Sequence, residues 1–520
     1  MVPRPRPWSG ADAGGATRSQ YADRIGTTGQ RPRGADDPSR ATAPDNPWHR
    51  SWRQVDQLDR LGPGSEIAVV TRTEQMALVG FLQAQNCTTI PAAWRHPEAR
   101  LDFTTADFYR HIGRTLERGC FDIGFFDDRL AMPDMYGDDH THTVENGIRC
   151  VKLDPTAVLM AMGMATEHVG LGATYSTTYH QPFHVARVFA TIDHLTGGRA
   201  AWNVVTSVND NEARNMGLDH GLAHDARYDQ ADEFMEVVHG HWDTWEDDAL
   251  VMDRDRGLFA RGDRVHRLDH RGRHYQSRGP FTVPRTPQGH PVVIQAGQSA
   301  RGSRFAARWG ELIFVSNLQL ESAKASYETL RAQAAELGRD PDSMRIATLV
   351  FPVVAPTRAQ AEDDKAAFDA LTKDIDELSL LSEGLNFDFS TKGLDDTFTP
   401  EELASLSGIQ AIRDRVIERS GGAEPTVRDF MRITSRASLN HAVVGDAGDL
   451  ADHLEEWFTT PACDGFVIGS SHQPGALENF VDLVVPELQR RGLVRERYTG
   501  TTLRDHLGLA VPQPGAWKST

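Results

Sequence analysis

Short apolar runs alternate with helical patterns along most of this sequence, and the alternation constrains the fold more than any other feature. Eight runs have the length and apolar character of buried strands: Met76–Leu82, Phe121–Phe126, Val169–Thr174, Ala200–Thr206, Val292–Ala296, Leu312–Val315, Ile346–Val353 and Gly465–Ile468. Patterns of helical period lie between them. Strands that alternate with helices form parallel sheets from βαβ units. Eight units predict an α/β fold, a (β/α)8 TIM barrel.

Two connections are too long to be simple loops. One follows the fourth strand, from Ser207 to Pro291, and the other follows the seventh, from residue 355 to about 444. We therefore expect long insertions after strands 4 and 7, with the second covering the barrel mouth. Residues 1–65 are rich in Pro, Gly, Arg, Asp and Ser and lack apolar periodicity, so we expect a disordered extension there.

Charge and cysteine content exclude several classes of partner. The chain has 55 Lys and Arg against 73 Asp and Glu, a formal charge of −18, and no long basic run. Nucleic acid and anionic membranes are therefore not expected as partners. Its four cysteines are widely separated and form no CxxC motif, which predicts no disulfide framework and favours a reducing cytoplasm. No apolar stretch approaches the roughly 20 residues that a membrane-spanning helix needs.

Polar residues gather where the predicted strands end. Active sites of TIM barrels lie at the carboxyl ends of the strands. The residues at four of these ends are Asp127, Asp128, Thr174, Tyr175, Thr206, Ser207, Gly297, Gln298 and Ser299. All of them are expected to surround one barrel mouth.

Two motifs near this mouth are compatible with anion binding. The segment from Gln295 to Gly302 joins a strand to a helix through small residues, and Ser299 and Arg301 would add a hydroxyl and a cation. His224 and Tyr228 are four positions apart and share one helix face, where they could contact one ligand. Both motifs have plainer explanations: a glycine turn, and an ordinary helix surface. Phosphate sites of barrels also more often follow strands 7 and 8 than strand 5.

Other candidate sites have weaker support. The segment DDHTH at 138–142 contains a carboxylate and two histidines, as metal sites do, but a solvated loop has the same composition. Cys87 could be a nucleophile or a buried bystander. The sequence contains no GxSxG, Walker or HExxH motif, so hydrolase and kinase functions lack their usual support.

Longer phrases identify a family. IDHLTGGRAAWNVVTS at 192–207, HDARYDQADEFMEVV at 224–238 and VIQAGQSARGSRFAARWG at 293–310 resemble flavin-dependent monooxygenases of the bacterial luciferase-like superfamily. The resemblance is closest to the branch that contains nitrilotriacetate monooxygenase, dibenzothiophene-sulfone monooxygenase and pristinamycin synthase. It extends over residues 76–512, which are therefore expected to form the luciferase-like barrel.

The resemblance implies a two-component monooxygenase. Reduced FMN, supplied by a separate NAD(P)H:flavin reductase, would be used with O₂ to oxygenate nitrogen, sulfur or carbon of a small organic substrate. By motif, Asp128 and Thr174 would lie near the flavin ring and Asn203 would face the pocket. His224, Tyr228 and Ser299 would surround the phosphate, with Gln298 beside them. A homodimer or homotetramer is also implied.

Three points stay open at the level of sequence. Asp127 precedes Asp128 where the family would have alanine, so a second carboxylate enters the ring environment. No catalytic residue is predicted, although His180 or His224 could steer a proton. A deazaflavin-dependent oxidoreductase of the same barrel superfamily and a non-catalytic flavin-binding protein are the alternative functions.

Overall fold

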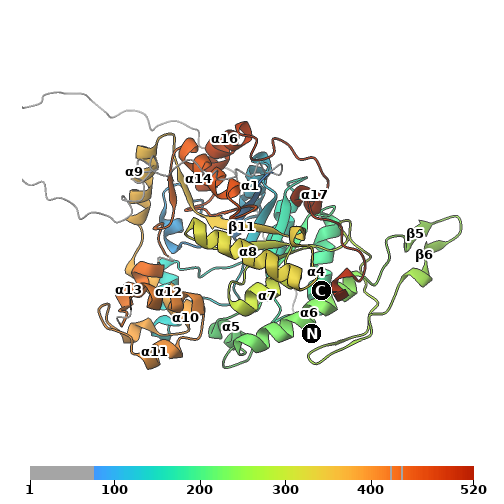
Figure 1. Ribbon diagram of the computed structural model, residues 1–520, viewed down its shortest axis with the longest axis horizontal. Helices are drawn as coiled ribbons and strands as arrows, with labels where there is room; N and C mark the ends of the chain where they lie inside the picture. Colours follow the sequence, from blue (N-terminus) through green and yellow to red (C-terminus); the bar gives the residue numbers. More distant parts are fainter. Residues whose placement is uncertain (1–74, 422–423, 435–436, 520) are drawn as a thin grey trace, which may run out of the picture. The chain divides into compact units, whose positions relative to one another are not determined.

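The computed structural model describes residues 75–421, 424–434 and 437–519 (Figure 1). The extension expected at residues 1–65 lies outside these described residues. No helix in the described ranges is long and apolar enough to cross a membrane.

The described residues contain one closed barrel of eight parallel strands, in the order β1-β14-β11-β10-β9-β4-β3-β2. Its strands are β1 Ala77–Gln83, β2 Ile123–Asp127, β3 Gly170–Ser176, β4 Ala200–Val205, β9 Val292–Gln295, β10 Leu312–Val315, β11 Arg345–Val350 and β14 Gly465–Ile468. The first and last strands close the barrel by pairing with each other, with Ala77 opposite Gly465. Each predicted strand is present, and the TIM-barrel prediction is confirmed.

Helices surround the barrel, as Figure 1 shows. Their bounds are α1 Ala106–Arg118, α2 Thr141–Asn146, α3 Pro155–Gly163, α4 Pro182–Leu195, α5 Asp210–Asn215, α6 His224–Trp242, α7 Ala300–Trp309, α8 Leu320–Glu336, α14 Ala447–Thr459, α15 Gly475–Asn479, α16 Val485–Arg490 and α17 Leu503–Leu507. The glycine pair after α4 has positive φ, 69° at Gly197 and 93° at Gly198, which suits the turn that leads into β4.

Side chains of both strand faces are buried, because helices cover the outside and side chains fill the inside. Trp202 of β4 points outward and stacks against Phe189 of α4, with 5.8 Å between ring centroids. Phe125 of β2 points inward and packs against Phe81 at 5.7 Å and Phe314 at 4.9 Å. Since successive strand residues alternate between faces, Asp127 shares the inner face with Phe125.

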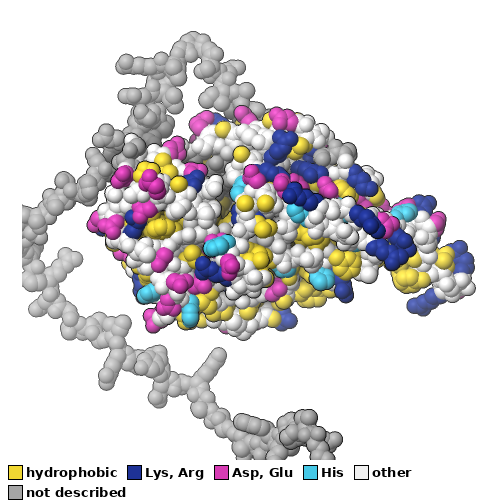
Figure 2. Space-filling model, turned by 90° about the horizontal axis from the view of Figure 1, so that it is seen from below, with side chains coloured by type: hydrophobic (Ala, Val, Ile, Leu, Met, Phe, Trp, Pro, Cys, Tyr) yellow, Lys and Arg dark blue, Asp and Glu magenta, His cyan; other side chains and the backbone are white. Residues whose placement is uncertain are grey.

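The connection between β4 and β9 contains α5, α6 and two hairpins. The hairpin strands are β5 Leu250–Asp253, β6 Leu258–Ala260, β7 His270–Arg271 and β8 Gln276–Ser277. The β5–β6 hairpin projects away from the barrel as an arm (Figure 1). Figure 2 shows basic side chains along this arm, where Arg256 pairs with Asp253 and Arg261 pairs with Asp248, each at 2.6 Å.

The second insertion follows β11, the seventh barrel strand. A small parallel pair flanks it, β12 Pro352–Val354 and β13 Val443–Gly445, and its helices are α9 Arg358–Asp369, α10 Asp374–Leu385, α11 Pro400–Ser405, α12 Gln410–Arg419 and α13 Val427–Thr434. Its helices share a separate apolar cluster around Phe389, Phe398 and Phe430. Arg95, in the loop after β1, holds this insertion to the barrel by donating to both carboxylate oxygens of Asp376 at 2.6 and 2.9 Å.

Candidate active site

A chain of polar side chains crosses the interior near the ends of β2, β3 and β4. The Asn203 Nδ2 atom donates to Thr174 Oγ1 at 2.9 Å, and Thr174 Oγ1 donates to the carbonyl of Phe126 at 3.0 Å. Both side chains are buried, with 4% of Asn203 and 3% of Thr174 exposed. Among the described residues, Asn203 Oδ1 has no hydrogen-bond partner. A buried acceptor without a partner is costly, so this oxygen fits a ligand N–H at the barrel mouth.

The turn between β9 and α7 forms the centre of a second cluster. Ser299 caps α7, because its Oγ atom accepts from the backbone N–H of Gly302 at 3.1 Å. His224, the first residue of α6, places its Nε2 atom 3.1 Å from the same Oγ atom. The helix N-terminus adds partial positive charge, and free amide N–H groups at such an end suit an anion.

Tyr228 makes this turn narrow. Its side chain is 6% exposed, and its ring lies 5.2 Å from that of His224. A Cβ atom at Gly297 would lie 2.8 Å from the Tyr228 hydroxyl, and one at Gly302 would lie 2.6 Å from it. Only glycine therefore fits at both positions. The structure brings His224, Tyr228 and Ser299 together, and we call these three residues the anion cluster after the ligand that the sequence predicts for them.

The other predicted residues of this turn behave differently. Gln298 is exposed, and together with Asn317 it lines a cavity of about 510 Å³ beside the turn. Arg301 does not supply a free cation to the cluster. Its guanidinium pairs with Asp232 at 2.6 Å and with Asp229 at 3.3 Å, because α6 presents both carboxylates to α7.

Asp127 and Asp128 line two different cavities. Asp127 follows the inner-face residue Phe125 by two positions and lines a mouth cavity of about 420 Å³. Asp128 lines another cavity, of about 410 Å³, together with Lys152. Burial raises the pKa of Asp128 from 3.8 to about 7, and it also raises the pKa of Asp127. The inward carboxylate is thus the second aspartate noted in the sequence, Asp127.

The mouth cavity is mainly apolar. Strands and the second insertion line it together, and the apolar side chains include Phe81, Ile90, Leu349, Phe351, Ile409 and Ile412. Its surface also contains three arginines. Arg129 lies 3.7 Å from Glu383, and Arg149 donates to the carbonyl of Thr89 at 3.1 Å. Within the described ranges Arg415 of α12 has no ion-pair partner, and burial lowers its pKa.

Sequence reasoning missed this cavity because half of its wall comes from the insertion. Ile409, Ile412 and Arg415 reach the mouth only after α12 has folded over it, and no motif marks them. The signal that was available is the length of the insertion itself, which predicted a cover for the mouth.

The remaining candidates do not join the site. Cys87 is buried, and burial raises the pKa of its thiol to about 11, which opposes a nucleophilic role at neutral pH. Residues 138–142 are exposed. His180 stacks on the outward-facing Tyr175 at 4.2 Å, and its Nδ1 atom lies 2.9 Å from the carbonyl of Ser176.

Comparison with known proteins places this geometry in a family. The family model described as luciferase-like monooxygenase matches residues 95–462. The chain belongs to the luciferase-like monooxygenase family. It is 43% identical to the dibenzothiophene-sulfone monooxygenase of Rhodococcus erythropolis over 456 residues, which are 85% of this chain and 99% of that protein. The prediction of a flavin-dependent monooxygenase of this branch is confirmed.

Solved structures of other proteins resemble this chain over most of its length. DmoA from Hyphomicrobium sulfonivorans is 32% identical, with a TM-score of 0.77 over 86% of this chain and 95% of that one. A riboflavin lyase solved with modified FMN and riboflavin is 31% identical, with a TM-score of 0.76 over 84% of this chain and 97% of that one. Within this family the anion cluster is a candidate flavin phosphate site.

Proposed function

We propose that this chain is the oxygenating component of a two-component monooxygenase. Reduced FMN would reach it from a separate NAD(P)H:flavin reductase, and a small organic substrate would be oxygenated with O₂. The observation that carries the proposal is the convergence of Ser299, His224 and Tyr228 on a glycine turn at the N-terminus of α7. Family membership and the FMN of a structural relative support the choice of ligand.

The residues present fit FMN at both ends. A phosphate on the glycine turn would accept hydrogen bonds from the Ser299 hydroxyl, an imidazole N–H of His224 and the free amides of α7. Gln298 is an additional side chain at this turn. The flavin ring would lie toward Thr174 and Asn203, where the unpaired Oδ1 atom of Asn203 would accept one ring N–H. Asp128 remains a proposed neighbour of the ring, and Asp127 is the carboxylate on the inner face.

Bound reduced FMN would supply the electrons that activate O₂ for transfer of one oxygen atom. The protein's contribution is to position the substrate and to exclude water. The apolar lining of the mouth cavity suits both tasks, since Phe81, Leu349 and Phe351 come from the barrel and Ile412 from its cover. Positioning the substrate and excluding water require no acid–base pair.

The cavity also suggests a class of substrate. An apolar body fits its aliphatic and aromatic wall, and Arg415 offers an unpaired guanidinium to an oxygen-rich or anionic group. We propose that the substrate combines the two, as aryl sulfinates, sulfonates or carboxylates do. The mouth cavity has a volume of about 420 Å³, which admits a molecule of a few fused rings.

We also propose that the chain forms a homo-oligomer in the cytoplasm. The arm formed by β5 and β6 exposes 60% of Met252 and 67% of Phe259. Exposed apolar side chains on a projecting hairpin suit burial against another chain. The four cysteines are free thiols, as a reducing compartment favours.

Product analysis under labelled oxygen tests the proposed function. The protein, a flavin reductase, FMN and NADH would be incubated with aryl sulfones, sulfonates and aminopolycarboxylates under ¹⁸O₂. We expect product that contains one ¹⁸O atom and that requires FMN. Turnover with a reduced deazaflavin in the absence of oxygen would instead support the oxidoreductase alternative. Flavin binding without any product across the panel would support the non-catalytic one.

A further inference from the structure

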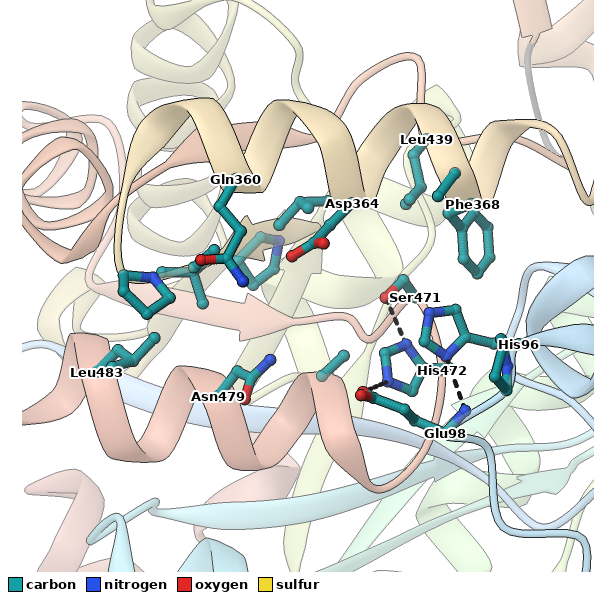
Figure 3. Close-up of a pocket in the computed structure, with 18 of the residues that line it drawn as sticks. His96, Glu98, Gln360, Asp364, Phe368, Leu439, Ser471, His472, Asn479 and Leu483 are labelled. Atoms are coloured by element: carbon teal, nitrogen blue, oxygen red, sulfur yellow. Dashed lines mark hydrogen bonds and ion pairs between the residues drawn. The ribbon is translucent and has the colours of Figure 1, made fainter. Parts of the chain in front are cut away.

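Three ligating side chains meet outside the mouth cavity. They are His96 and Glu98, in the loop after β1, and His472, in the loop after β14 (Figure 3). One ligating atom from each lies within 4.8 Å of the others. The imidazole rings of His96 and His472 stack with centroids 3.7 Å apart, and His472 Nε2 lies 3.6 Å from Glu98 Oε2. The 3.6 Å between His472 Nε2 and Glu98 Oε2 is too long for a hydrogen bond but suits two ligands of one ion.

His472 is oriented as a ligand would be. It is 6% exposed, and its Nδ1 atom lies 3.1 Å from the Ser471 hydroxyl. Its Nε2 atom is buried and has no hydrogen-bond partner among the described residues. Metal-bound histidines commonly use the second ring nitrogen to hold such an orienting hydrogen bond.

We propose that His96, Glu98 and His472 bind one divalent transition-metal ion, of which Zn²⁺ is the best fit. Two imidazole nitrogens and one carboxylate oxygen are a preferred ligand set for zinc, and three protein ligands leave a coordination position open. That position faces a cavity of about 760 Å³. Asp364 points from α9 into the same cavity in Figure 3, and its carboxylate is a candidate for an additional ligand.

A metal ion at this position would cross-link the two loops that follow β1 and β14. β1 and β14 are the strands that close the barrel, and the loops that follow them supply all three ligands. Hydrogen bonds already join these loops, from Thr88 Oγ1 to the carbonyl of Ser471 at 3.3 Å and from Arg100 N to the carbonyl of Gln473 at 3.0 Å. A bound ion would add a stronger cross-link at the same seam. This site is independent of the flavin.

Metal titration of the full-length protein tests the proposal. The protein is stripped with a chelator, and Zn²⁺ binding is followed by calorimetry and by thermal unfolding. Co²⁺ serves as the spectroscopic probe, because its visible absorption reports nitrogen and oxygen ligands. We expect one tight equivalent and a rise in Tm. Glu98→Gln and His96→Gln should each weaken binding by about tenfold or more, since even outer-shell changes cost that much.

Matched controls separate this site from adventitious binding. Glu246→Gln changes another carboxylate beside a histidine, His266 at 2.7 Å, and should leave binding unchanged. Changing His140 and His142 together to Gln removes the competing DDHTH segment and should also have no effect. The proposal is overturned if no tight equivalent binds, or if Glu98→Gln and His96→Gln bind as the parent does. Because Glu98 is exposed, its variant is expected to fold, and Tm without metal verifies this.

Discussion

His224 and Ser299 are 75 positions apart in the sequence, yet the Nε2 atom of His224 lies 3.1 Å from the Ser299 hydroxyl. The contact joins the first turn of α6 to the first turn of α7. Two helix N-termini therefore meet above the end of β9, with Tyr228 beneath them. This arrangement concentrates hydrogen-bond donors at one point of the barrel rim, and it is the basis of the proposed phosphate site.

Replacement of Asn203 should weaken flavin binding without lowering the thermal stability of the protein. Asn203→Leu keeps the size of the side chain and removes the unpaired buried oxygen, whose desolvation costs about 1–3 kcal/mol. We expect a Tm equal to or above that of the parent, together with about tenfold weaker binding of reduced FMN. Thermal unfolding and anaerobic fluorescence titration measure the two quantities. Unchanged affinity would show that Asn203 does not contact the flavin.

The Asp128 carboxyl should make stability depend on pH. Its folded-state pKa is raised from 3.8 to about 7 by burial, so between pH 4 and 7 the folded protein holds a proton that the unfolded chain has lost. Stability therefore falls as pH rises through this window and stays level above it. Asp128→Asn carries no such proton, so its advantage over the parent should grow from pH 4 to pH 7.

Urea unfolding at pH 5 and pH 8 measures this difference. Asp255→Asn, in the exposed turn between β5 and β6, is the control and should follow the parent at both values. An Asp128→Asn variant whose advantage is equal at the two pH values would contradict the buried carboxyl.

The barrel was predictable because local patterns determine it, whereas the meeting of His224 with Ser299 was implied only by the family resemblance. Apolar runs mark strands that are covered on both faces, and their carboxyl ends in a parallel barrel meet at one mouth. That rule alone placed Thr174 and Ser299 at the mouth, whereas Asn203 was placed there by the family resemblance. The face that a strand residue presents depends on strand register, which a shift of one residue reverses, and this register places Asp127 in the lining of the mouth cavity.

Contacts that depend on the insertions were not predictable in this way. Arg415 reaches the mouth, and Asp376 reaches Arg95, only because α10 and α12 dock onto the barrel. The His96 and His472 cluster joins loops that are almost a whole chain length apart. Arg301 looked like a free cation until α6 supplied Asp232. In each case a long-range tertiary contact, rather than a local pattern, determines the role.

The charge of Arg415 should select among substrates. Arg415→Gln removes an unpaired guanidinium from the mouth cavity, and a hydrogen bond to a charged group contributes about 1.5–3 kcal/mol. We expect KM for anionic substrates to rise about tenfold, and KM for neutral ones to change little. Arg413→Gln is the matched control, because Arg413 lies on the same helix and pairs with Asp414 at 2.8 Å. Equal effects on both substrate classes would rule out a charge contact.

Breaking the buried ion pair between Arg95 and Asp376, which holds the insertion to the barrel, should lower the free energy of unfolding. The Asp376 side chain is 0% exposed and accepts two hydrogen bonds from Arg95. Asp376→Ala leaves a buried guanidinium without its partner, which typically costs about 3–5 kcal/mol. Urea unfolding measures the loss. Asp395→Ala breaks the exposed pair with Arg428, where Asp395 is 81% exposed, and should have little effect. Similar losses in both variants would contradict the docking role of Asp376.

The most direct measurement of the central claim compares reduced FMN with reduced riboflavin, which lacks the phosphate. Both are titrated anaerobically into the parent, Ser299→Ala and Ser303→Ala. Ser303 is the control, since it lies on the same helix and bonds to Gln333 at 2.8 Å. We predict that the parent and Ser303→Ala bind FMN at least about tenfold more tightly than riboflavin, and that Ser299→Ala loses most of this preference. Equal affinity of the parent for both flavins, or an unchanged preference in Ser299→Ala, would contradict the phosphate site.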